Sequence, residues 1–294
     1  MARSSVSSVA KDHRRWLATD GDRIRRRATP GLESALEEQS VPGLREAVVH
    51  LSHLATYCGT KGSVAVLDGD ENGYADIGKA VTYRYLALLI DAKSFSTTAF
   101  LHGVGGGHSL TGECGICSCL FCCGIACDDS AVADDCGGVL HAMTTIPKAL
   151  DEEFWRSRVF EPFALRMYFD YRGMDEEGGL LPDVGVYSEA AASLSRQVPL
   201  SASETKKLCD YHCANMVDRG GSHVPEFTDS PFDLIPFEIM ALRKLHARKN
   251  IEVAAVDHPL LTGPLAQVER IRRPPDALAM RVEHVYRSIF GADA

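Results

Sequence analysis

The sequence has 294 residues, of which 45% are hydrophobic, 24% charged and 7% aromatic. This is the composition of a folded globular protein, and it excludes a disordered, collagen-like or coiled-coil chain. Forty acidic against 31 basic residues give a formal net charge of -9, which argues against a general nucleic-acid-binding surface. Because no run of about 18 apolar residues occurs, the sequence also predicts no membrane-spanning helix.

Residues 1–30 are rich in serine and arginine, with three consecutive arginines shortly before Pro30. This pattern is typical of a mobile or loosely docked N-terminal arm, here ahead of a single all-α domain in residues 31–294. The twin arginine of residues 14–15 is followed by no apolar core, so we do not interpret it as an export signal. Together with ten cysteines, this predicts a cytoplasmic protein with reduced thiols.

The first strongly periodic segments lie in the N-terminal third of the chain. Apolar residues recur every three or four positions over residues 43–58, which predicts an amphipathic helix that Gly59 and Gly62 end. Residues 63–67 then look extended. The helical period returns and predicts a second helix over residues 74–100.

An almost uncharged segment, residues 110–127, predicts a buried helix. Asp128, Asp129 and Ser130 follow it as a turn and as the N-cap of a shorter helix. Further periodic segments predict helices over approximately residues 151–169, 201–217, 234–245 and 276–290.

Besides residues 63–67, only residues 251–256 look strand-like. Both segments are too short and too far apart to build a sheet-based domain. We therefore predict a mainly α protein, either a multi-helix bundle or a solenoid-like stack of antiparallel helix pairs. No repeat period decides between the two.

Six cysteines lie in the uncharged segment, in the pattern Cys-x-x-Cys-x-Cys-x-x-Cys-Cys-x-x-x-Cys. Thiols at this density could hold a metal ion. The residues between them are apolar, however, and on a helix only Cys119, Cys123 and Cys127 form one stripe. We therefore predict a buried core helix that binds no metal. The alternative is a cysteine-rich helical metal-binding or thiol redox protein, with His108 or His141 assisting.

The acidic residues that begin at Asp68 match the first half of a calcium-binding loop, with oxygen donors at positions one, three and five and glycine at position six. Lys79 stands at position twelve, where the loop needs a carboxylate. The pattern therefore predicts an acidic turn that caps the next helix, without functional calcium affinity.

Other chemical motifs are missing from the sequence, including Gly-x-Ser-x-Gly and His-Glu-x-x-His. His212 lies between Cys209 and Cys213 on an apolar stripe, which indicates a core histidine whose hydrogen bonds are satisfied. The carboxylates that stand out cluster in first turns and loops, and no acid/base pair is identified. The sequence therefore predicts no enzyme, no cofactor and no metal site.

The order of the segments carries a family resemblance. The uncharged helix, its acidic turn and an aromatic-rich helix at residues 154–171 are followed by Pro-Phe-Glu-Ile-Met-Ala-Leu at 236–242, Asn-Ile-Glu-Val at 250–253 and Asp-His-Pro-Leu-Leu at 257–261. This order resembles the immunity protein 49 family of bacterial polymorphic toxin systems, over roughly residues 40–265. The resemblance implies an all-α fold with a short extended element after its final helix.

The resemblance also implies a binding function, in which the protein neutralises a cognate bacterial toxin in a stoichiometric complex, without a catalytic residue, a nucleic acid or a membrane. The net charge of -9 fits this function, since many nuclease toxins are basic and complementary charge speeds association. Asp175, Glu176 and Glu177 form an acidic loop that we expect to contribute to capture. The alternative for this loop is a solvated turn beside Gly178 and Gly179.

Overall fold

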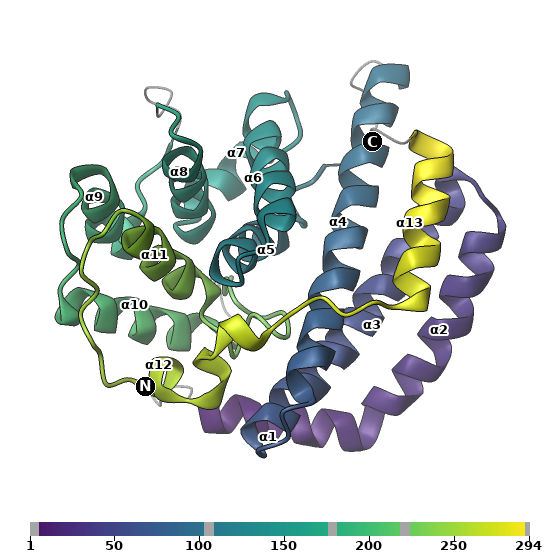
Figure 1. The fold of residues 1–294 in the computed structure, drawn as a ribbon. Coiled ribbons are helices and arrows are strands. Elements are labelled where there is room, and N and C mark those ends of the chain that lie inside the picture. The colour runs from purple at the N-terminus through teal and green to yellow at the C-terminus, as the bar shows by residue number, and fades with distance from the viewer. Residues whose placement is uncertain (1–5, 103–108, 176–180, 218–223, 292–294) are drawn as a thin grey trace. The chain divides into compact units, whose positions relative to one another are not determined.

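The structure is a computed structural model that describes residues 6–102, 109–175, 181–217 and 224–291 (Figure 1). Within these ranges the regular structure is entirely helical. The prediction of a mainly α, multi-helix protein built from packed helix pairs is therefore confirmed.

Contacts within the chain gather it into two compact units. Unit 1 contains residues 1–9 and 111–270, and unit 2 contains residues 10–110 and 271–294. Both units are therefore made from segments that are separated along the sequence.

The N-terminal residues form one continuous helical run. Helix α1 (Val6–Trp16) leads through a π-helical turn (Leu17–Gly21) into α2 (Asp22–Glu37). Pro30 lies inside α2, so the residue at which the predicted arm ends falls within a helix. The mobile arm and the single domain after it stay predictions.

Unit 2 contains two long consecutive helices, α3 (Val41–Leu67) and α4 (Gly73–His102), which lie side by side in Figure 1. Helices α2 and α13 (Ala277–Phe290) pack against this pair. Their shared core is formed mainly by alanine, leucine and valine side chains, namely Ala28, Leu32, Leu36, Leu44, Ala47, Leu51, Leu54, Ala55, Leu86, Ile90, Ala279, Val282 and Val285.

Helix α3 is longer than the sequence predicts. Residues 63–67 are its last turn and not a strand, and Gly59 and Gly62 lie buried within it. The reason is a close helix contact: a Cβ atom on Gly62 would lie 2.6 Å from the carbonyl oxygen of Gly73 in α4. Here glycine allows two backbones to approach, and this packing outweighs its low helix propensity.

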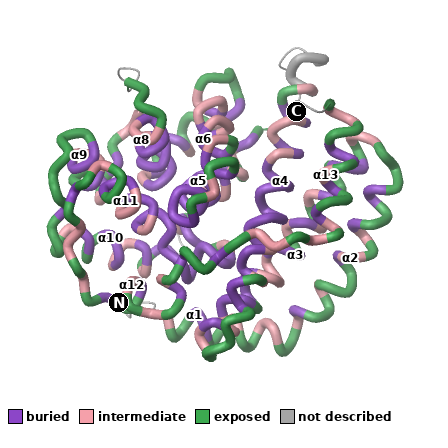
Figure 2. The backbone as a smooth tube through the Cα atoms, viewed as in Figure 1, coloured by how far each residue is buried: buried purple, intermediate pink, exposed green. Residues whose placement is uncertain are grey.

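Unit 1 is built from shorter helices, namely α5 (Cys114–Ala126), α6 (Ser130–Thr145), α7 (Glu152–Ser157), α8 (Phe160–Arg172), α9 (Ser188–Arg196), α10 (Ala202–Asn215), α11 (Phe237–Arg248) and α12 (Pro259–Thr262). Helix α5 packs against α6, α8 and α11. All of α5 except Gly115 and Ile116 is buried (Figure 2). The predicted buried helix is thus confirmed as the core element of unit 1.

The single helix predicted over residues 151–169 is wrong, because the structure has two helices there. The chain is extended at Arg158, between α7 and α8. Pro162 explains the break: its ring would clash with the carbonyl group four residues earlier in a continuous helix. In the first turn of α8, by contrast, a missing backbone N–H costs no helical hydrogen bond.

Two further sequence predictions can be compared with the structure. The capping box is confirmed, since Ser201 Oγ accepts a hydrogen bond from the backbone N–H of Glu204 at 3.1 Å, at the start of α10. Residues 251–256 are an irregular connection and not a strand. They follow Asn250, whose φ of 57° ends α11 in the left-handed region, and no strand in the described part of the chain offers them a partner.

Candidate functional site

The cysteine stripe of α5 lies in the interior of unit 1, as the sequence predicts. Cys119 and Cys123 are buried within the helix, and Cys127 is the buried residue that caps its C-terminus. Cys123 Sγ lies 3.9 Å from Cys127 Sγ, and Cys127 Sγ donates to the carbonyl oxygen of Val268 at 3.4 Å. The thiols therefore act as small side chains in the core.

The pKa values of these thiols agree with that role. Burial raises the pKa of Cys114, Cys119 and Cys122 well above the usual value, and the pKa of Cys123 is raised by its hydrogen bond to Cys127 and by burial. Since the thiolate is both the nucleophile and the metal ligand, a thiol held in its protonated form is poorly suited to either task.

Metal ligands do not converge in the part of the chain that the structure describes, where no group of three or more His, Cys, Asp or Glu side chains could hold an ion. His108 lies outside the described residues. In the acidic turn between α3 and α4, Asp70 Oδ1 accepts from the backbone N–H and the Nδ2 of Asn72, both at 2.9 Å. Lys79 Nζ lies 3.7 Å from Asp276. The absence of calcium affinity stays a prediction.

A buried group of charged residues lies at the start of α8, and sequence reasoning missed it. Arg158 Nε donates to Glu161 Oε1 at 2.9 Å and lies 3.8 Å from Glu226 Oε1. All three side chains are buried, with Glu161 0% exposed. One guanidinium thus stands between two carboxyl groups in the interior of unit 1.

Glu226 is the well-satisfied member of this pair of carboxyls. Its Oε1 accepts from the backbone N–H groups of Val159 and Phe160, at 3.2 and 3.4 Å, and its Oε2 accepts from Tyr211 Oη at 2.8 Å. Glu226 therefore caps the start of α8 and links it to α10. The Arg158 guanidinium also donates to the carbonyl oxygen of Val224 at 2.8 Å, which fixes the same connecting segment.

Glu161 is the member that takes up a proton. Its Oε2 is buried without a hydrogen-bond partner among the described residues. Burial and the charge of Glu226 raise the pKa of Glu161 to about 7, against the lowering effect of Arg158. Near neutral pH this carboxyl group is therefore divided between its protonated and ionised forms.

The local sequence contains a signal for this cluster. Arg158 and Glu161 are spaced as an i,i+3 pair within a run that is otherwise apolar or aromatic, from Val159 to Leu165. Two opposite charges in such a run indicate a buried pair. Nothing local connects them to Glu226, which comes from a different segment of the chain, so its participation was not predictable.

The prediction for His212 is confirmed. The ring is fully buried and stacks on Phe227, with the ring centroids 4.3 Å apart. Its Nδ1 lies 2.9 Å from Glu238 Oε1, and its Nε2 lies 3.0 Å from the carbonyl oxygen of Asp233. When Glu238 is ionised, both contacts are hydrogen bonds only if both ring nitrogens carry protons.

The pKa of His212 follows from these contacts. Burial acts to lower this pKa, but the charge of Glu238 and the hydrogen bonds to Glu238 and to the carbonyl of Asp233 outweigh burial and raise it. His212 and Glu238 thus form a buried hydrogen-bonded pair that joins α10 to α11, and the pair is an ion pair when His212 is protonated.

The predicted partner-binding residues lie after α8. Asp175 is exposed, and Glu176 and Glu177 fall outside the described residues. Their role in binding therefore stays a prediction.

Comparison with protein-family models, with curated proteins and with solved structures finds no match to this chain. Among the described helices, none is both long and apolar enough to cross a bilayer. The resemblance to the immunity protein 49 family rests on the segment order alone and stays a prediction, and so does the cytoplasmic location.

Proposed function

We propose that the protein binds a protein partner in a stoichiometric complex, and that this partner is a cognate toxin of a bacterial polymorphic toxin system. The observation that carries the proposal is the distribution of charge. Unit 1 contains 25 acidic and 15 basic residues, a net charge of -10, whereas unit 2 contains 15 acidic and 16 basic residues, a net charge of +1. The acidity of the chain therefore belongs to unit 1, which would attract a basic partner.

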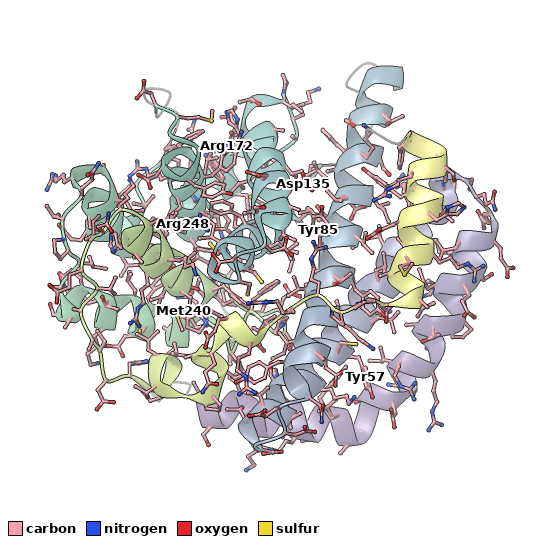
Figure 3. All side chains as sticks on the ribbon, viewed as in Figure 1. Tyr57, Tyr85, Asp135, Arg172, Met240 and Arg248 are labelled. Atoms are coloured by element: carbon pink, nitrogen blue, oxygen red, sulfur yellow. The ribbon has the colours of Figure 1, made fainter. Side chains whose placement is uncertain are left out.

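The surface of unit 1 supports this proposal. Several of its basic side chains already have acidic partners: Arg172 donates to Asp134 at 2.7 Å and lies beside α6 (Figure 3), and Arg248 donates to Asp128 at 3.3 Å. Other exposed acids are Asp135, Asp151, Glu153, Asp175, Asp183, Glu189, Glu252, Asp257 and Glu269. A basic surface would meet excess negative charge on several helices and loops.

The interior of unit 1 supports a scaffold more than a catalyst or a redox protein. The thiols of α5 are buried and protonated, and Glu226 and His212 are engaged by neighbouring helices. These groups join helices to one another, so the proposed action needs no turnover of a substrate.

The proposal is tested with the toxin domain encoded next to this protein. The toxin's activity is measured at increasing molar ratios of the protein, and we expect complete inhibition near one protein per toxin. A toxin that stays fully active in an excess of the protein overturns the proposal. Turnover of a substrate by the purified protein alone would contradict the non-enzymatic part of it.

A further inference from the structure

Unit 1 contains a pocket that the proposed function does not use. It has a volume of about 580 Å³ and is lined by residues of α6, α7 and α8, of the connection after α6, and by Leu181 and Pro182 after α8. Volumes of roughly 300 to 1,000 Å³ are typical of pockets for small ligands. The pocket is therefore large enough for a molecule of metabolite size.

The floor of the pocket is apolar and aromatic. Met143, Trp155, Leu165 and Phe169 line it, and all four are buried in unit 1. A flat or branched apolar group would leave water and contact aromatic rings on this floor.

Two polar groups at the pocket have no partner in the described part of the chain. The ring of His141 packs edge-on against Phe169, with the ring centroids 5.3 Å apart and the planes at 84°. Neither the ring nitrogens of His141 nor the indole N–H of Trp155 makes a hydrogen bond to a described residue, and neither group is sealed from solvent. A ligand in the pocket could bind both.

Two cations and one acid line the pocket. Lys148 and Arg156 line it, and the acid that lines it, Glu152, is paired with Arg156 at 3.2 Å. The hydroxyl of Thr144 donates to the carbonyl oxygen of His141 at 2.8 Å, so this hydroxyl is not a hydrogen-bond donor for a ligand. Within an acidic unit, this pocket thus presents hydrogen-bond donors and cations.

We propose that the pocket binds a small carboxylate with an aromatic or branched apolar body. The body lies against Trp155 and Phe169, and the carboxylate accepts hydrogen bonds from His141 and from the Trp155 indole and faces the charge of Lys148. The proposal does not require that the protein captures a toxin.

The fluorescence of Trp155 can report binding in the pocket. The sequence has two tryptophans, Trp16 and Trp155, so Trp16→Phe leaves the pocket tryptophan as the sole indole fluorophore. This variant is titrated with 3-phenylpropionate, 4-methylpentanoate and cyclohexanecarboxylate, and heats of binding are measured on the unmodified protein. We expect at least one carboxylate to saturate the signal with a Kd below about 1 mM, and its uncharged amide to bind at least tenfold more weakly.

The matched variants are Lys148→Met and Lys206→Met. Both remove one exposed lysine of unit 1, but Lys206 lies on α10 and does not line the pocket. We expect Lys148→Met and His141→Leu each to weaken binding at least fivefold, and Lys206→Met to leave the Kd within twofold. The proposal is overturned if none of the three carboxylates binds at 10 mM, if the amide binds as tightly as the acid, or if Lys148→Met and His141→Leu leave the Kd unchanged in folded protein.

Discussion

The two compact units achieve a packed interior by different means. In unit 2, long helices meet over an apolar core, and Gly62 and Gly73 bring two backbones into contact. Arg84 and Asp91 are the Asp, Glu, Lys and Arg side chains that α4 buries within its described part. The fit of this unit therefore depends mainly on shape.

In unit 1, shorter helices surround α5, and polar side chains in the interior hold several of them together. The Arg158 guanidinium connects the start of α8 to the segment that carries Glu226, and His212 connects α10 to Glu238 in α11. Buried polar contacts of this kind are costly when one member is lost. We therefore expect unit 1 to be sensitive to the loss of single charges and unit 2 to be sensitive to the addition of single methyl groups.

The strongest test of this difference is Arg158→Met. The change leaves two buried carboxyl groups without their shared cation, and we expect it to lower the free energy of unfolding by about 3 to 5 kcal/mol. The measurement is urea unfolding at pH 8, with the exposed Arg156→Met as the control, for which we expect less than about 1 kcal/mol. Equal losses of unfolding free energy in the two variants would show that the buried Arg158 contributes no more to stability than an exposed arginine.

In unit 2 the corresponding test is Gly62→Ala. The new methyl group would lie 2.6 Å from the Gly73 carbonyl oxygen and push α3 from α4, which we expect to cost about 1 to 3 kcal/mol. The control is Gly138→Ala in α6, where a Cβ atom meets nothing closer than 3.9 Å and the better helix propensity of alanine should stabilise slightly. If Gly62→Ala proves as stable as the control variant, the contact between α3 and α4 accommodates an added methyl group, and the close packing inferred for unit 2 is wrong.

The cysteines of α5 allow a finer test of the interior of unit 1. Cys123→Ser buries a hydroxyl group in place of a thiol, and we expect a loss of about 1 to 3 kcal/mol, whereas Cys123→Ala should be milder. Thermal unfolding compares the two variants, and elemental analysis of protein purified without chelator measures bound zinc. Stoichiometric zinc, or a serine variant as stable as the alanine variant, would contradict a purely structural role.

The Glu161 carboxyl predicts a dependence of stability on pH. Its pKa is about 7 in the folded protein against the ordinary value of 4.5. The folded state therefore holds this proton more tightly, so the contribution to stability is complete below about pH 4.5, falls as the pH rises to 7 and stays low above it. We expect Glu161→Gln, which cannot ionise, to gain stability relative to the unmodified protein across this window.

Urea unfolding at pH 5 and at pH 8 measures this gain. The control is Glu204→Gln, because hydrogen bonds from Lys207 and two serines lower the pKa of the partly exposed Glu204 to about 2. Its contribution changes only below about pH 4.5, so the control profile should run parallel to that of the unmodified protein between pH 5 and 8. A parallel profile for Glu161→Gln as well would rule out Glu161 as the proton-binding group.

The smallest expected effect concerns the surface of unit 1. Replacing Asp175, Glu176 and Glu177 by alanine should slow association with a basic toxin and flatten its salt dependence, with little change in dissociation.

The control for this loop removes the same charge from unit 2, through Glu33→Ala, Glu37→Ala and Glu46→Ala, all of which are exposed. Stopped-flow association at low and high salt compares the two triple variants. If the association rates of both variants match that of the unmodified protein, the loop is not part of the interface. This result would leave the proposal of toxin binding unchanged.

Local signals were enough to predict much of this fold. The helical period predicted α4, the uncharged segment predicted the burial of α5, and Ser201 with Glu204 marked the start of α10. Each of these depends on residues within a few turns of one another, which is the range over which caps and periodicity act.

The features that sequence reasoning missed depend on contacts between distant segments. From local sequence the glycines of α3 indicate a helix end, but in the structure Gly62 packs against α4. Glu226 likewise has the local sequence of a loop residue, but in the structure it caps the start of α8. The pocket beside His141 likewise combines residues of α6, α7 and α8. Tertiary contact overrides local preference at each of these points.

The burial of the cysteines has a practical consequence for following the folding of this protein. Of its ten free cysteines, only Cys58 and Cys213 are partly accessible, and burial raises the pKa of Cys58 to about 12. An alkylating reagent should therefore reach Cys58 and Cys213 in the native state and reach the α5 thiols only when unit 1 opens. Mass spectrometry of the modified chain would then count opening events of α5 without any introduced label.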